Sequence, residues 1–145
     1  MENLIYKINT DGGSRGNPGP AAVGYVIQGP GMEKKEVGEY IGETTNNVAE
    51  YSAVIFALKK LKSIIGTDKV KQAKVEVRTD SELLVKQVNG KYKIKEPGIQ
   101  NLFLELWNTR LDFGSVSFYH VYREENQDAD RMVNHALDQQ SNRLL

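Results

Sequence analysis

The chain contains no cysteine. Disulfide frameworks, thiol nucleophiles and Cys-ligated zinc are therefore excluded. It also has no excess of charge of either sign, because 19 lysines and arginines balance 19 aspartates and glutamates. A protein that holds a polyanion by overall charge needs an excess of positive charge. Any contact with nucleic acid must therefore be local.

Long apolar runs are absent as well. No segment approaches the roughly 20 apolar residues of a membrane span, and the start MENLIYKINTDGG lacks the basic and apolar regions of a secretory signal. We expect a cytoplasmic protein with no membrane contact. The length of 145 residues, with 39% hydrophobic and 26% charged residues, is typical of one globular domain. We therefore expect a single domain over residues 1–145, and a monomer.

Strand and helix patterns alternate along the chain. Turn formers in DGGSRGNPGP predict that the first strand ends where a loop begins, at Asp11. Four helices are predicted from caps and apolar spacing, and the first should end near Gly66. The strands come first as a meander, and the overall order favours an α/β fold, a mixed sheet with helices packed on it. The predicted strands cover residues 4–10, 21–28, 34–42, 73–79 and 115–122, and the helices begin near Asn46, Ser81, Pro97 and Asn126.

Four carboxylates fall at the ends of these elements. Asp11 and Asp80 each end a predicted strand, while Glu50 and Asp130 lie early in helices. If the two strands are parallel neighbours, their ends lie about 5 Å apart, and helix starts can bring the other acids to the same edge. Carboxylate oxygens suit Mg²⁺, and two ions about 4 Å apart can activate water and stabilise a leaving oxygen. Taken singly, Glu50 or Asp130 is better explained as a partner of a helix dipole.

The sequence around each acid is more specific. The four segments are TDGGSRGNPGP (10–20), TTNNVAEY (44–51), TDSELLV (79–85) and HVYREENQDADRMVNHAL (120–137). In this order they resemble the four blocks of the type 1 ribonuclease H family. The resemblance implies a ribonuclease H-like α/β fold, with three antiparallel strands, two parallel strands and helices on both faces. It also implies an endoribonuclease that cuts the RNA strand of RNA/DNA hybrids and leaves 5′-phosphate and 3′-hydroxyl ends.

The resemblance assigns a role to each acid. Catalytic Asp11 would bridge two Mg²⁺ ions, for which Mn²⁺ could substitute. Glu50 and Asp80 would complete one metal site, and Asp130 the other. Further matching positions would contact the hybrid, although such residues are also ordinary turn and cap formers. These substrate-binding positions are Gly12, Gly13, Asn17, Thr45, Asn46 and Asn47.

One catalytic position has two candidates. Counted back from Asp130 without a gap, His120 matches a family histidine thought to help proton transfer or product release, and a pKa of about 6.5 suits imidazole to that task. If the intervening loop is shorter than in other members, Arg123 takes this place and faces the phosphate. A partnered strand-end histidine, or a surface pair of Arg123 with Glu124 or Glu125, is the simpler interpretation.

The chain departs from the family pattern around the substrate groove. Many bacterial members insert a basic helix where this chain has only GKYKIKE (90–96). Lys86, Lys91, Lys93 and Lys95 around Tyr92 could form a smaller backbone track. Glu43 and Glu82 replace a frequent basic residue and a frequent glutamine, which predicts weak, salt-sensitive binding.

Two other functions stay open. One is a related nuclease acting mainly on double-stranded RNA. The other is a non-catalytic nucleic-acid binding module of the same fold, which the four intact acids disfavour because they repel phosphate.

Overall fold

One five-stranded sheet in the order β3-β2-β1-β4-β5 forms the centre of the computed structural model, which describes residues 4–143. The first three strands form an antiparallel meander, and β4 and β5 extend the sheet in parallel from β1. The mixed sheet expected from the resemblance is confirmed. Its strands are β1 (Ile5–Ser14), β2 (Gly19–Gln28), β3 (Lys35–Thr44), β4 (Lys74–Thr79) and β5 (Ser115–His120).

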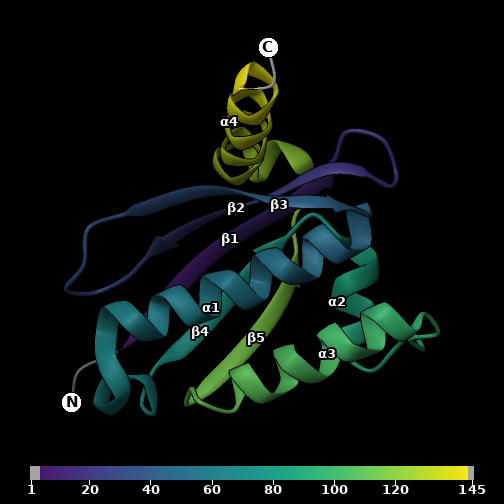
Figure 1. Cartoon of the computed structure of the whole chain (residues 1–145). Coiled ribbons are helices and arrows are strands. Elements are labelled where there is room, and N and C mark those ends of the chain that lie inside the picture. Colours follow the sequence, from purple (N-terminus) through teal and green to yellow (C-terminus); the bar gives the residue numbers. More distant parts are fainter. Residues whose placement is uncertain (1–3, 144–145) are drawn as a thin grey trace.

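Helices cover both faces of the sheet (Figure 1). One face carries α1 (Asn46–Val70), α2 (Glu82–Val88) and α3 (Pro97–Arg110), and the opposite face carries α4 (Gln127–Arg143) alone. The short 3₁₀ turn η1 (Arg123–Glu125) leads into α4. Within the described residues, no helix combines the length and the apolar character that crossing a bilayer requires.

The two faces have cores of unequal size. The larger core lies between the sheet and α1 to α3, and includes fully buried Ile8, Leu58 and Leu106. Under α4 there is only a small cluster, formed by Ala22, Val133, Ala136 and Leu137 with Tyr40 against it. Burial of apolar area on both faces holds the sheet in place, and the α1 side contributes most of it.

The helices begin where cap chemistry predicts. Thr45 caps α1 by accepting from the Val48 N–H at 3.3 Å, and Ser81 caps α2 in the same way from Leu84 at 3.2 Å. The predicted end of the first helix is a break rather than an end: Gly66 has φ 86° and ψ 165°, and one further helical turn follows it. Glycine adopts this conformation without the steric cost of a side chain.

The predicted end of the first strand is wrong. β1 continues through Asp11 to Ser14, with Asp11 opposite Gly24 and Gly13 opposite Ala22 on β2. The two glycines predict a turn by their type, but in the structure they pair with β2 and the turn comes after them. Asp11 is thus held within a strand.

Candidate active site

The four predicted acids line one open pocket of about 300 Å³. Asp11 comes from β1, and Asp80 directly follows β4. Because these strands are parallel neighbours with Thr10 opposite Thr79, the two acids follow at the same height. Glu50 enters from α1 on one face of the sheet, and Asp130 from α4 on the other. The site therefore exists only when both layers pack on the sheet.

Gly12 allows Glu50 to come close to Asp11. A Cβ at Gly12 would collide with the backbone of Ala49 and of Glu50 in α1. Without a side chain, β1 and the first turns of α1 meet backbone to backbone. Packing alone therefore requires glycine at this position.

Gly24 does the same for the other face and was missed in the sequence. A Cβ at Gly24 would collide with the carbonyl oxygen of Ala129, the residue before Asp130. An isolated glycine inside the buried strand pattern AAVGYVIQ is a signal of close backbone approach. That signal could have identified the position, but not the helix that packs there.

Burial and neighbouring charges raise the pKa of two of the acids, Asp11 and Glu50. Burial, the charge of Asp80, and a hydrogen bond and charge from Asp130 raise the pKa of Asp11 to about 8, against a smaller opposing effect of the Gly12 N–H. Burial also raises the pKa of Glu50, and the charge of Asp80 adds to this while a hydrogen bond with Ser81 opposes it. The raised pKa values show that negative charges at this site repel one another. A bound cation would relieve that repulsion, as a proton does.

The chemistry of the donor set fits Mg²⁺ or Mn²⁺. All four groups are carboxylates, whose hard oxygens these ions prefer. Among residues 4–143, no three His, Asp or Glu side chains are spaced as a preformed coordination shell. The acids share a pocket and repel one another within it, so a cation would have to draw them together.

Hydrogen bonds made by two asparagine side chains connect the end of β1 and the β1–β2 turn to the start of α1. The Asn46 Oδ1 accepts from the backbone N–H of Ser14 at 2.9 Å and from its hydroxyl at 3.1 Å. The backbone N–H of Asn46 donates to Asn17 Oδ1 at 3.0 Å. Gly13 and Asn46 line the carboxylate pocket, whereas Asn47 lines a neighbouring pocket that also reaches Glu50. The turn and the helix start thus form one wall of the site.

The two candidates for the remaining catalytic position lie in different places. His120 is exposed at the end of β5, with its ring centroid 5.4 Å from that of Tyr122. Among the described residues it is not part of the pocket lining, whereas Arg123 is. The Arg123 side chain is 80% exposed, and its Nη2 lies 4.0 Å from Asp130 Oδ1. The geometry brings Arg123 to the acids and leaves His120 outside the lining of their pocket.

Asn134 is a further contact of Asp130 that sequence analysis missed. Its Nδ2 donates to the Asp130 carbonyl at 3.2 Å and to Asp130 Oδ2 at 3.4 Å. The spacing of four residues on one helix was the available signal.

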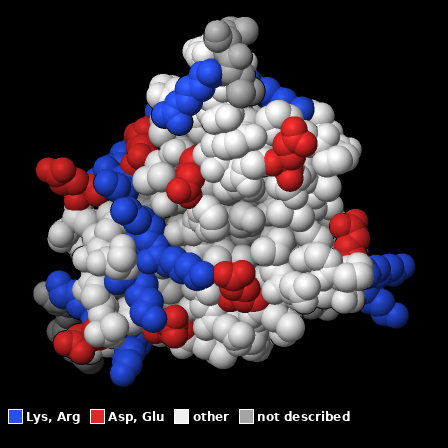
Figure 2. Space-filling model, viewed as in Figure 1, with Lys and Arg blue, Asp and Glu red and all other residues white. Residues whose placement is uncertain are grey.

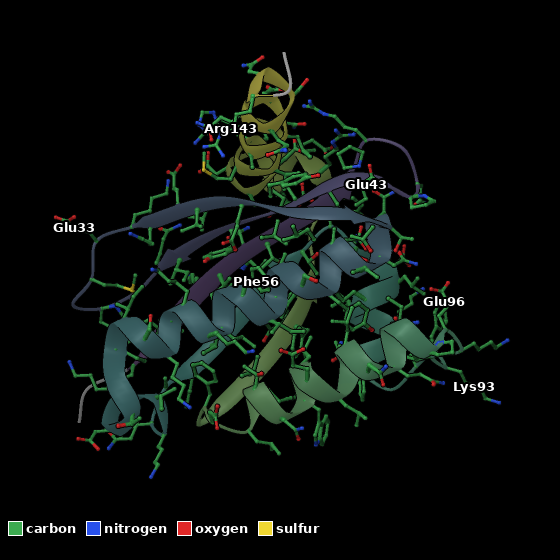
Figure 3. The ribbon with its side chains drawn as sticks, in the orientation of Figure 1. Glu33, Glu43, Phe56, Lys93, Glu96 and Arg143 are labelled. Atoms are coloured by element: carbon green, nitrogen blue, oxygen red, sulfur yellow. The ribbon has the colours of Figure 1, made fainter. Side chains whose placement is uncertain are left out.

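Hydrogen bonds through Gln87 connect the lysine-bearing segment after α2 to α1. The Tyr51 hydroxyl donates to Gln87 Oε1 at 2.7 Å, and Gln87 Nε2 donates to the Lys93 carbonyl at 3.4 Å. Lys93 and Lys95 line a pocket of about 150 Å³ that also includes Glu50. Figure 3 shows the Lys93 side chain extending away from the ribbon at this end of the molecule.

Lys86 makes its contacts with other side chains of this protein, an ion pair and a cation–π interaction. Its Nζ pairs with Glu82 at 2.7 Å and lies 4.9 Å from the Tyr92 ring centroid.

On the face seen in Figure 2, lysines and arginines gather mainly toward the left, with acids scattered among them. Positive charge is thus local, as the zero net charge predicts.

Comparison with known proteins agrees with this geometry. Residues 9–136 match a family described as reverse transcriptase-like. The structure of LC11-RNase H1, isolated from compost, superposes with a TM-score of 0.85 and 46% identity over 94% of this chain and 97% of that one. The same relative in complex with an RNA/DNA hybrid matches with a TM-score of 0.85 and 46% identity, over 92% of this chain and 97% of that one. The fold is that of a ribonuclease H-like protein.

Curated relatives narrow the class. Ribonuclease HI of Halobacterium salinarum is 41% identical over 88% of this chain, which spans 62% of that relative. The bifunctional protein Rv2228c of Mycobacterium tuberculosis is 38% identical over 90% of the chain, which spans 35% of it. Ribonuclease H of Hydrogenovibrio crunogenus is 31% identical over 90% of this chain and 93% of its own length. The chain belongs to the type 1 ribonuclease H family.

Proposed function

We propose that the chain is an endoribonuclease that hydrolyses the RNA strand of RNA/DNA hybrids with two divalent cations. The observation that carries this proposal is the single pocket lined by Asp11, Glu50, Asp80 and Asp130. These acids come from four separate sequence blocks and from both faces of the sheet. The hybrid bound by LC11-RNase H1 supports the choice of substrate.

Each acid has a proposed part in holding the ions. Asp11 is central, since the charges of both Asp80 and Asp130 act on it. By the resemblance to the family, Asp11 would contribute to holding both ions, together with Glu50 and Asp80 for one ion and Asp130 for the other. When bound, Mg²⁺ supplies activation of the attacking water and stabilisation of the leaving oxygen, which gives 5′-phosphate and 3′-hydroxyl ends.

Selection of the RNA strand rests on polar groups beside the acids. A 2′-hydroxyl can be read by amides and backbone groups. Gly12, Gly13, Asn46 and Asn47 line the pockets at the start of α1, and Asn17 lies in the adjoining turn.

Phosphate contacts are proposed for two side chains near these groups and for two lysines beyond the pocket. The Thr45 oxygen accepts a backbone bond in the helix cap, and its hydroxyl proton can still be donated to a phosphate. Arg123 reaches the carboxylate pocket, and its guanidinium matches phosphate geometry. His120 retains its predicted part in proton transfer or product release. Lys93 and Lys95 would hold the hybrid backbone beyond the pocket.

A cleavage assay tests the proposal. Matched RNA/DNA hybrid, double-stranded RNA and double-stranded DNA are incubated with Mg²⁺, Mn²⁺ or a chelator. We expect cutting of the RNA strand of the hybrid only, and none with chelator. Equal cutting of all three duplexes would contradict hybrid specificity, and cutting in chelator would contradict the metal roles. Binding without cutting would favour a non-catalytic module. Cytoplasmic location and monomeric state remain predictions.

A further inference from the structure

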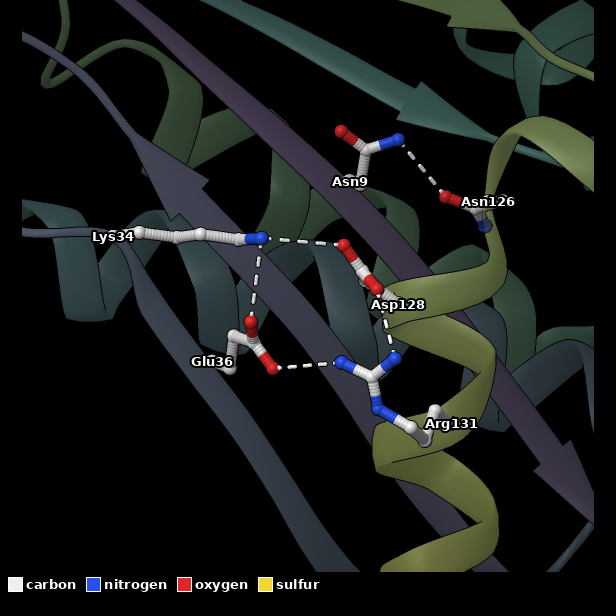
Figure 4. A network of polar contacts seen from close by, with 6 residues as sticks. All are labelled: Asn9, Lys34, Glu36, Asn126, Asp128 and Arg131. Carbon is white, nitrogen blue, oxygen red and sulfur yellow. Dashed lines mark hydrogen bonds and ion pairs between the residues drawn. The ribbon is translucent and has the colours of Figure 1, made fainter.

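Asn126 is a buried polar residue immediately before α4. Its side chain and backbone together are only 2% exposed. The side-chain Nδ2 donates to the Thr10 carbonyl at 2.8 Å, and Oδ1 accepts from Asn9 Nδ2 at 3.0 Å. Figure 4 shows the second of these bonds. The amide of Asn126 is thus bound to β1 at the two residues that precede Asp11.

The main chain of Asn126 leads to the other acid. Its carbonyl accepts from the backbone N–H of Asp130 at 3.1 Å. This residue is therefore linked through its side chain to the neighbour of Asp11, and through its backbone to Asp130. Burial strengthens the bond to the Thr10 carbonyl, because water has little access to compete for these groups.

A second contact holds the same turn of α4 against the sheet. The Ala129 carbonyl rests on Gly24, and Gly24 lies directly opposite Asp11 on β2. Backbone packing at Gly24 sets how closely α4 approaches, and the Asn126 amide sets where along β1 it lies. Both contacts fall beside Asp11, so together they fix Asp130 relative to it.

An ion-pair network holds the outer side of this turn and provides a contrast. Lys34 pairs with Glu36 and Asp128, both at 3.3 Å, and Arg131 pairs with Glu36 at 3.1 Å and with Asp128 at 3.0 Å (Figure 4). These side chains are partly or largely exposed, so water and salt screen their attraction. They touch the helix but do not reach Asp11 or its neighbours on β1.

We propose that Asn126 is a positioning residue that sets the separation of Asp130 from Asp11 and thereby the affinity for the cation pair. This inference rests on the proposed metal-dependent function. Groups that orient metal ligands from behind typically change metal affinity or activity by about 10–100-fold when they are removed.

Isothermal titration of the substrate-free chain with Mn²⁺ and with Mg²⁺ tests it. We expect Asn126→Ala to bind the ions about 10–100-fold more weakly than the wild type. Glu36→Gln, which breaks the exposed network on the same turn, should stay within about twofold. In hydrolysis, kcat of Asn126→Ala at low metal should fall and recover as metal is raised, while KM for the hybrid stays unchanged.

Asn126→Asp keeps the volume and the acceptor but loses the donor to Thr10. Its added negative charge alone would favour a cation, so weaker binding in this variant cannot come from charge. If the wild type binds neither ion, the proposed function fails. If the wild type binds and a folded Asn126 variant binds equally well, the inference is overturned. It is also overturned if circular dichroism shows both variants unfolded, because Asn126 would then act on the whole fold.

Discussion

Asp11 and Gly24 lie directly opposite each other on the antiparallel strands β1 and β2. The residue that faces the central acid is therefore the one whose missing side chain admits the Ala129 backbone of α4. Strand register thus decides where the helix that carries Asp130 can approach Asp11.

Substitution of Gly24 should destabilise the protein. Gly24→Ala places a methyl group against the Ala129 carbonyl, and we expect a loss of about 1–3 kcal/mol in the free energy of unfolding. Gly98→Ala is a matched control in α3, because no described atom lies within 4 Å of the added methyl. It should be neutral or more stable by up to about 1 kcal/mol. Urea denaturation measures both, and equal stability of the two variants would contradict the packing argument.

Removal of a metal-binding charge should disable the enzyme without unfolding it. Asp11→Asn or Asp80→Asn is expected to reduce kcat/KM by more than the about 10–100-fold typical of an outer-shell change. The shape of the side chain is kept, so no cavity opens and the melting temperature should not fall. Asp112→Asn, at a surface pair with Lys62, is the control and should retain activity. Near-wild-type rates in either site variant would show that the metal assignment is wrong.

Stability of the metal-free chain should depend on pH through Asp11. The pKa of Asp11 is about 8 in the native state, compared with 3.8 for an ordinary aspartate, which represents the unfolded chain. Between these values the native state binds more protons, so the free energy of unfolding falls as pH rises. Asn does not titrate, so the free energy of unfolding of Asp11→Asn should not fall in this way. We expect the variant to become more stable than the wild type from pH 4 to pH 8, by more than the about 1.4 kcal/mol that one pKa unit represents.

Denaturant titrations in chelator across this range measure the difference, which should be small below pH 4. Saturating Mg²⁺ should stabilise the wild type and leave Asp11→Asn nearly unchanged. A constant difference at every pH would contradict the raised pKa.

Arg123 and His120 should give different kinetic defects. Arg123→Ala removes a proposed phosphate contact, so we expect weaker hybrid binding and a salt dependence whose slope is smaller by about one ion. His120→Ala should slow turnover without abolishing it. Binding and single-turnover rates at several salt concentrations separate the two effects. An unchanged rate for His120→Ala would mark the histidine as structural, and an unchanged salt slope for Arg123→Ala would remove its phosphate role.

Local chemistry made much of the fold predictable. Thr45 and Pro97 mark helix starts through capping and a fixed backbone angle, and Gly66 marks a break, so their signals lie within a few residues. The end of β1 was not predictable in this way. Whether Gly12 and Gly13 continue a strand depends on pairing with β2, which sequence composition does not contain.

The site divides in the same manner. Four acids in four recognisable blocks could be predicted, and the structure gathers them in one pocket. The contributions of Gly24 and Asn126 to the site could not be predicted, because they depend on how α4 packs on strands that are distant in the sequence. The contrast between His120 and Arg123 likewise required the path of the chain after β5.

Because the apolar cluster under α4 is small, this helix should be less stably held on the sheet than α1. Fewer buried apolar groups hold it than hold α1, so its backbone amides should exchange hydrogen earlier than those of β1. An opening of α4 would carry Asp130 away from Asp11 while the larger core stays folded. We therefore expect the proposed hydrolysis to cease at a lower urea concentration than global unfolding, because detachment of α4 alone would separate the acids.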